Sequence, residues 1–206
     1  SWKWLSAAAA VIILAVIVRL FRVVSKKNLG ELALSEISLP ENLVSAPTVR
    51  SDQQRITAGD SLLNLGFKAA ISGDFSEAIE LYNTIIMEYP EQPVAVQSYL
   101  NRGIIQFNRN HLAEAIASFK EVVDNAGETS IIREKGYWYL GNAYINADSL
   151  NEAYDAILKT YAMEGVFQKP AGDMLRNMDK VMDNPVRENH SLHPADWLLQ
   201  KTGYNY

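Results

Sequence analysis

The three histidines are the first side chains to consider for catalysis or metal binding. His111 falls in an expected turn between helices, whereas His190 and His193 occur near the C-terminus in the stretch HSLH. Together with Glu188 and Asp196 these two histidines could hold a divalent metal if the segment folded back as a loop, but no third clear ligand is evident. We interpret them as solvated tail residues, and the sequence predicts no metal site and no cofactor.

Other catalytic chemistry has little support in the sequence. There is no cysteine, which excludes disulfides, thiolate zinc sites, iron–sulfur ligation and a cysteine nucleophile. No nucleophile–base pair, phosphate-cradling glycine loop or acidic pair stands out. The formal net charge of −5 and the pI near 5.3 argue against nucleic-acid binding by the chain as a whole. The sequence therefore predicts that the protein is not an enzyme and has no nucleic-acid partner.

An apolar stretch near the N-terminus is typical of a membrane anchor. No charged residue occurs in Trp4 to Val18, and apolar residues continue to Val24. As a helix, Trp2 to Val24 would span about 34 Å at about 1.5 Å per residue, enough for a hydrocarbon core of about 30 Å. We predict a single-pass anchor with a basic flank at residues 1–27, in contact with the lipid bilayer. Its interfacial and snorkelling residues are Trp2, Trp4, Arg19 and Arg22.

Two alternatives concern this stretch. A cleavable signal peptide is disfavoured because Arg19, Leu20, Phe21 and Arg22 follow the apolar run where small residues are needed. Basic residues are more numerous after the span than before it, so the positive-inside rule favours a cytoplasmic domain. A basic segment preceding Ser1 would reverse this orientation and place the domain in the periplasm. We expect a single-pass protein of the bacterial inner membrane.

Residues 28–55 are interpreted as a linker. Gly30, Pro40 and Pro47 interrupt the stretch, and no helical period extends beyond the short LGELALSEI. We expect a flexible tether, with a short helix and docking along a partner as the alternative.

A repeat begins after this linker. Glycines and alanines recur at intervals of 37 and 38 residues, and each alanine follows its glycine by twelve residues. Bulky residues such as Leu65, Tyr82 and Phe119 surround them, and GDF, NHL and DSL occur where paired helices would turn. Small residues at matched positions let two helices approach closely. These recurring positions are Gly66, Gly103, Gly141, Ala78, Ala115 and Ala153.

The pattern resembles the tetratricopeptide repeat (TPR) family over about Thr57 to Met163, with Pro90 at the family's proline position. Arg102 departs from it by replacing a leucine-like residue, and the units exceed the family's usual length of about 34. The resemblance implies an all-α fold with stacked antiparallel helix pairs, expected at residues 56–169, whose first helices line a concave groove. It also implies a terminal cap.

The resemblance places a set of asparagines, aromatic residues and neighbouring side chains in that groove. Rings would supply contact area, and amides would satisfy the backbone of an extended peptide; packing between repeats is the alternative for each residue. The expected protein-binding residues are Asn64, Phe67, Asn101, Ile104, Phe107, Lys135, Trp138, Tyr139 and Asn142, together with Leu63, Asn108 and Asn146.

Two C-terminal segments follow the repeats. PAGDMLRNMDKVMDN at residues 170–184 carries an apolar stripe that includes Met174 and Met178, so we predict a capping helix, with an adaptable binding face as the alternative. In the tail at residues 185–206, Trp197 and its apolar neighbours would dock on the domain or on a partner.

The expected function is a membrane-anchored scaffold that binds other protein subunits or peptides, as an accessory or structural subunit of a larger membrane complex. The alternative is a chaperone-like receptor that captures polypeptides at a translocation machine.

Overall fold

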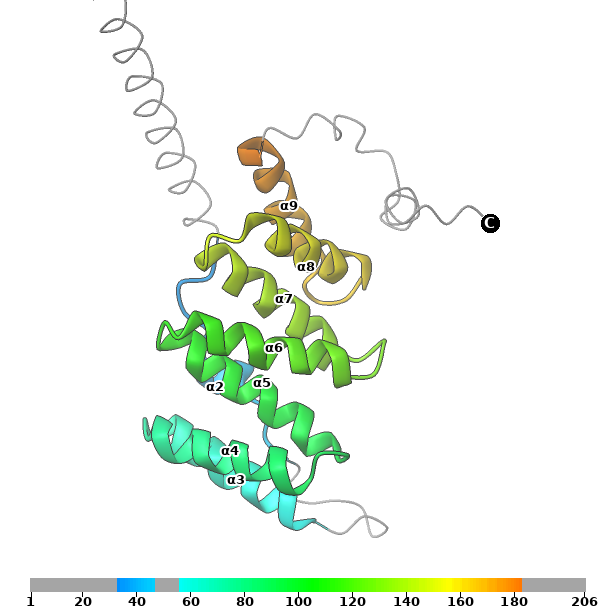
Figure 1. Cartoon of the computed structure of the whole chain (residues 1–206). Coiled ribbons are helices and arrows are strands. Elements are labelled where there is room, and N and C mark those ends of the chain that lie inside the picture. Colours follow the sequence, from blue (N-terminus) through cyan, green and yellow to red (C-terminus); the bar gives the residue numbers. More distant parts are fainter. Residues whose placement is uncertain (1–32, 47–55, 183–206) are drawn as a thin grey trace, which may run out of the picture.

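The computed structural model describes residues 33–46 and 56–182, and within these ranges the fold is all-α. Eight helices occur there without a strand (Figure 1). The short helix α2 precedes seven longer ones. Their bounds are α2 Leu39–Asn42, α3 Ala58–Ile71, α4 Phe75–Glu88, α5 Pro93–Asn108, α6 Leu112–Asn125, α7 Ile131–Asn146, α8 Leu150–Ala162 and α9 Gln168–Met182.

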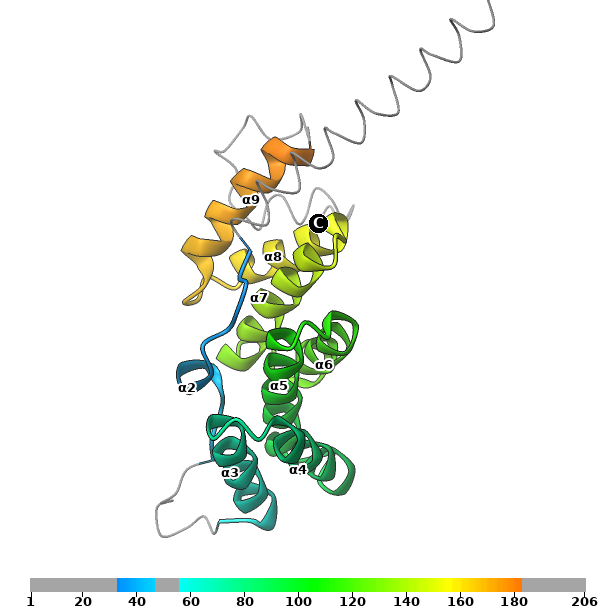
Figure 2. The same cartoon turned by 90° about the vertical axis from the view of Figure 1, so that its left-hand side faces the viewer.

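Helices α3 to α9 form a helix stack in which each helix contacts its successor (Figures 1 and 2). Helix α5 also contacts both α3 and α7, so the first helices of the three pairs lie next to one another. This succession of paired helices is solenoid-like, as the repeats predicted.

The recurring glycines mark the closest approach within each pair. A Cβ placed on Gly66 would lie 2.6 Å from Tyr82, and one on Gly103 would lie 2.6 Å from Phe119. The third pair, α7 with α8, shows the same contact between Gly141 and a side chain sixteen residues later, Ile157, at 2.4 Å. Because carbons do not approach one another this closely, a larger residue at any of these positions would force the facing side chain to move.

The turns inside the pairs also repeat. Gly73, Asn110 and Asp148 all have positive φ, at 85°, 59° and 63°. In each turn the next N–H bonds back to a carbonyl five residues earlier, as His111 does to Gln106 at 2.8 Å. This is the Schellman ending of a helix, for which Gly and Asn are the favoured residues. The predicted turns are therefore confirmed.

Arg102 has a structural role that explains its departure from a leucine-like residue. Its Nη1 donates to Asn83 on α4 at 2.6 Å, and its Nε donates to Ser118 on α6 at 3.1 Å. Ser118 donates onward to Gln106 at 2.7 Å. Burial lowers the pKa of Arg102, and its guanidinium lies 5.1 Å from the ring centre of Tyr99. The side chain thus joins two neighbouring repeats.

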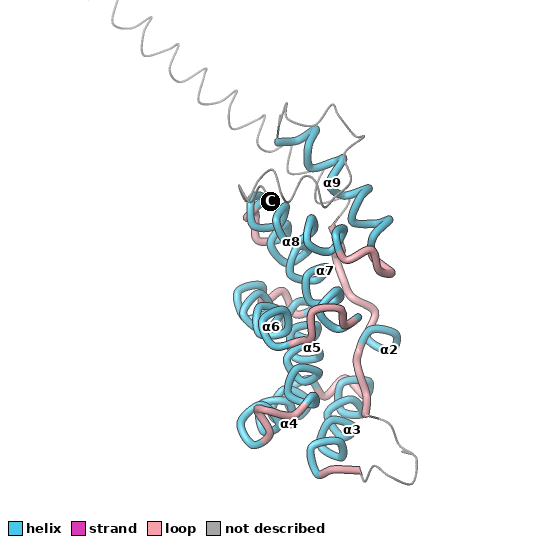
Figure 3. Tube along the Cα trace, turned by 90° about the vertical axis from the view of Figure 1, so that its right-hand side faces the viewer, coloured by secondary structure: helices cyan, strands magenta, loops and turns pink. Residues whose placement is uncertain are grey.

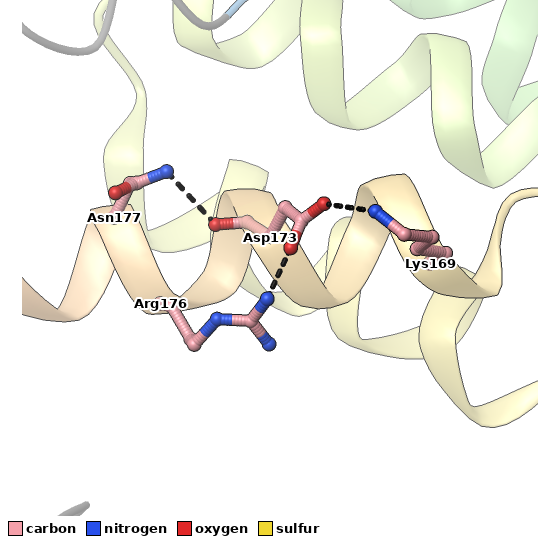
Figure 4. A network of polar contacts seen from close by, with 4 residues as sticks. All are labelled: Lys169, Asp173, Arg176 and Asn177. Carbon is pink, nitrogen blue, oxygen red and sulfur yellow. Dashed lines mark hydrogen bonds and ion pairs between the residues drawn. The ribbon is translucent and has the colours of Figure 1, made fainter.

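Helix α9 ends the described part of the helix stack. Met174, Leu175 and Met178 are buried, and α9 packs against α8. The methionine stripe therefore faces inward, as expected of a cap. On the exposed side Asp173 accepts bonds from Lys169, at 3.2 Å, and from Arg176 (Figure 4). Exposed pairs of this kind contribute little to stability.

Among residues 33–46 and 56–182, no helix is long and apolar enough to cross a membrane. The predicted anchor at residues 1–27 and the tail beyond 182 lie outside the described residues.

Candidate functional site

Residues 33–46, called the groove segment below, lie along the first helices of the three pairs. The segment passes α7 first, then α5, and last α3, opposite to the order of these helices in the chain (Figures 2 and 3). Its contacts reach residues up to 112 positions away in the sequence. The interpretation of residues 28–55 as a free tether is therefore wrong for residues 33–46, which form part of the fold.

The contact with α7 uses both backbone groups of one residue. The N–H of Leu34 donates to Oδ1 of Asn142 at 2.9 Å, and Nδ2 of Asn146 donates to the Leu34 carbonyl at 3.0 Å. Asn146 also donates to the backbone of Asn142 at 2.9 Å. Two amides one helical turn apart thus satisfy Leu34 as a neighbouring strand would.

On α5 two asparagines each bond both backbone groups of one residue in the groove segment. Asn108 accepts the N–H of Ile37 at 2.8 Å and donates to its carbonyl at 2.8 Å. Asn101 accepts the N–H of Val44 at 2.7 Å and donates to its carbonyl at 2.7 Å. A side-chain amide has one acceptor and two donor hydrogens, which matches the donor and acceptor of one peptide residue.

The contacts at α3 and at the middle of the groove segment are single bonds. Asn64 accepts the N–H of Ala46 at 3.0 Å. The hydroxyl of Tyr139 donates to Oδ1 of Asn42 at 2.6 Å, which is a bond to a side chain rather than to the backbone. Recognition of the backbone therefore extends over all three helix pairs.

Buried surroundings hold the amides in place. Asn101 and Asn142 are fully buried, and each donates a further bond, to the Tyr82 hydroxyl at 3.3 Å and to the Trp138 carbonyl at 2.8 Å. Because burial disfavours the phenolate, the pKa values of Tyr82 and Tyr139 are raised. Both hydroxyls therefore stay neutral at physiological pH, where Tyr82 accepts from Asn101 and Tyr139 donates to Asn42. The groove is thus polar but uncharged along this row.

Apolar side chains complete the contact. Ile37, Leu43 and Ala46 are buried at 2%, 7% and 3% exposure and belong to the main hydrophobic cluster, whereas Glu36 and Glu41 are exposed. Full burial of an Ile or Leu side chain contributes about 1.5–3 kcal/mol. The groove segment is consequently held both by its backbone and by aliphatic side chains.

The asparagine positions follow the repeat. Asn64 and Asn101 each precede the repeat glycine by two residues, and Tyr139 occupies that position in the third pair. Asn108 and Asn146 each follow the glycine by five residues. The repeat register was therefore the sequence signal for these groove positions.

Several residues that were expected in the groove form no hydrogen bond with the groove segment. Ile104 and Phe107 are core residues with 0% and 3% exposure, and Trp138 stacks on Phe167 of the α8–α9 loop with ring centres 5.4 Å apart. Phe67 and Lys135 are only partly buried, and burial lowers the pKa of Lys135. Leu63 is also fully buried.

Within the described ranges, no group of three His, Cys, Asp or Glu residues could hold a metal ion. His190 and His193 lie outside those ranges.

No protein-family model matches the chain, and no curated protein matches it. The geometry of the groove is therefore the main guide to function.

Proposed function

We propose that the chain is a membrane-anchored scaffold of the tetratricopeptide type that mediates protein–protein interaction by binding extended polypeptide in its groove. The observation that carries this proposal is the set of paired backbone bonds from Asn101 and Asn108 to the groove segment. Bonds to backbone groups do not depend on the ligand's side chains, so they suit a groove that receives a polypeptide. The aliphatic contacts of Ile37 and Leu43 supply selectivity.

The occupied groove favours a stable scaffold over a receptor that captures free polypeptides. A segment tethered to its own groove has an effective concentration on the order of millimolar. A free ligand must compete with this, which weakens transient capture. The chaperone-like receptor is the second candidate. Both roles require that the groove segment be displaced, but a receptor needs this at every capture, whereas a scaffold needs it once on assembly.

The proposed membrane localisation rests on the sequence. The groove segment follows the predicted anchor at residues 1–27 after a few residues, so a docked segment would keep the helix stack close to the bilayer. The charge bias favours a cytoplasmic domain at a bacterial inner membrane. An accessory or structural subunit of a membrane complex fits this arrangement.

The test uses a full chain whose groove is emptied by substitutions in the segment. In Ile37→Asp/Leu43→Asp, called the released variant, two buried side chains become carboxylates, which cannot stay buried without partners. A fluorescent peptide with the sequence of residues 33–46 should bind this variant with micromolar affinity. The matched control carries Asn101→Ala and Asn108→Ala in addition and should bind at least about tenfold more weakly.

Circular dichroism of both variants checks that the helix stack stays folded. Absence of saturable binding by the folded released variant up to millimolar peptide would contradict the proposed function.

A further inference from the structure

The spacing of the asparagines on α5 does not match the spacing of the residues they bind. Asn101 and Asn108 are seven residues apart, which is about 10.5 Å along a helix. An extended chain covers this distance in about three residues at roughly 3.3 Å each. In the groove segment the two bound residues, Ile37 and Val44, are instead seven positions apart.

The neighbouring steps of the segment show the shorter spacing. Leu34, bound to α7, and Ile37, bound to α5, are three residues apart. Packed helices lie about 8–10 Å apart, so a step of three extended residues fits the distance between adjacent helices. Only the step along α5 carries surplus residues, and the surplus is four.

The surplus corresponds to helix α2. Leu39–Asn42 comprises four residues, none of which is buried, while the flanking Ile37 and Leu43 are buried. An open pocket of about 510 Å³ separates α2 from the end of α3, lined by Leu39, Pro40 and Ile71 among others. Helix α2 therefore bulges beside this pocket, and it contacts the stack through the partly buried Leu39, the bond from Tyr139 to Asn42 and a contact with α3.

The burial pattern supports the same conclusion. Without residues 39–42, the order is Ile37 buried, Ser38 exposed and Leu43 buried. This alternation is what a continuous extended chain shows on a surface. The sequence ALSEISLVSA, which is residues 33–46 without α2, would then present one bound residue every third position along α7 and α5.

We infer that the groove segment is a resident occupant with a four-residue insertion, and that the better-matched ligand is a continuous extended segment of a partner protein. This inference rests on the proposed function and names its ligand. The partner segment has an aliphatic residue at the Ile37 position, a second two residues later, and a small residue three further on. It carries no charge at these three positions, because they contact a buried apolar surface. Binding of this partner displaces residues 33–46.

The experiment compares peptides on the released variant, the full chain with Ile37→Asp/Leu43→Asp. The probes are the peptide of residues 33–46, the shortened peptide ALSEISLVSA, a shuffled form of the shortened peptide, and the peptide of residues 33–46 with 39–42 replaced by Gly-Ser-Gly-Ser. Titration by fluorescence anisotropy gives each Kd. We expect the shortened peptide to bind about tenfold more tightly than the peptide of residues 33–46, because the entropy saved by ordering four fewer residues exceeds the loss of the Tyr139–Asn42 bond and of the Leu39 contact.

The outcomes separate this inference from the proposed function. If the peptide of residues 33–46 binds and the shortened peptide binds equally or more weakly, the inference is overturned and the proposed function stands. Equal binding by the shuffled peptide, or by the Gly-Ser-Gly-Ser peptide, also overturns it, because register or length would then not matter. If neither native-sequence peptide binds, the proposed function fails and the inference fails with it.

Discussion

Two neighbouring residues of α5 use buried polar groups for different purposes. Asn101 faces the groove segment and bonds the backbone of Val44, whereas Arg102 faces the other way and joins α4 to α6 through Asn83 and Ser118. We expect loss of the first contact to release mainly the groove segment, since two of the three bonds of Asn101 go to Val44 and one goes to Tyr82 on α4. Loss of the second contact affects the packing of two repeats. The comparison shows that adjacent polar residues of one helix can serve mainly the packing between repeats, as Arg102 does, or mainly the segment in the groove, as Asn101 does.

The largest effect is expected at Arg102. Arg102→Ala leaves Asn83 and Ser118 without their charged donor, and we expect the free energy of unfolding to fall by about 3 kcal/mol. Urea denaturation followed by circular dichroism measures it. The groove segment should keep its protease resistance under native conditions; early cleavage within residues 33–46 would contradict the separation of the two roles.

A smaller effect is expected at Asn101. Asn101→Ala removes both bonds to Val44 and the bond to the Tyr82 hydroxyl, which should cost about 2 kcal/mol. The loss should appear mainly as release of the groove segment, measured as faster amide exchange at Val44 and Ala46. Equal acceleration in α4 and α6 would show that Asn101 also holds the repeats together.

Combining groove substitutions tests the same point through additivity. Asn101→Ala with Asn108→Ala should destabilise by less than the sum of the single variants, because the loss cannot exceed the docking free energy of the segment. The control is the double variant Arg102→Ala/Asn101→Ala, which changes two adjacent residues with different roles. Its loss in the free energy of unfolding should be close to the sum of the two single losses. A double groove variant that is additive would indicate that the asparagines support the stack itself.

The smallest effect is expected at Tyr139. Tyr139→Phe removes one bond to Asn42 and should cost about 1 kcal/mol. Burial raises the pKa of Tyr139 above its ordinary value, so its contribution is complete below about pH 10 and is lost as the pH rises further. Thermal unfolding at pH 8 and above pH 10 should show an alkaline loss that is reduced in the variant. An unchanged alkaline loss would exclude Tyr139 as its source.

The part of the fold that depends on the repeat could be predicted from sequence. Gly66 and Gly103 meet large side chains sixteen residues later, a constraint that leaves a fixed period in the sequence. The asparagine positions were expected from the resemblance to the tetratricopeptide repeat family, and they recur in the same register. Leu65, by contrast, was expected near the helix contacts but is 51% exposed. Successive residues of a helix point in different directions, so a residue next to the buried Gly66 can lie on the solvent face.

The docking of the groove segment could not be predicted because its signal is not local. Ile37, Leu43 and Ala46 show neither a helical nor a strand period, and Pro40 suggests a linker. Their burial depends on contacts with residues far along the chain, such as the bond between Ile37 and Asn108. Without the partner helices in place, the same residues would be an ordinary spacer.

The central claim is that the backbone of residues 33–46 is bonded in the groove of the full chain. Amide hydrogen exchange at single-residue resolution tests it most directly. The account predicts slow exchange at Leu34, Ile37, Val44 and Ala46, whose N–H groups are bonded to asparagines, and faster exchange at the exposed Ser35 and Glu36. Uniformly fast exchange at all six positions, with the helix stack still protected, would contradict it.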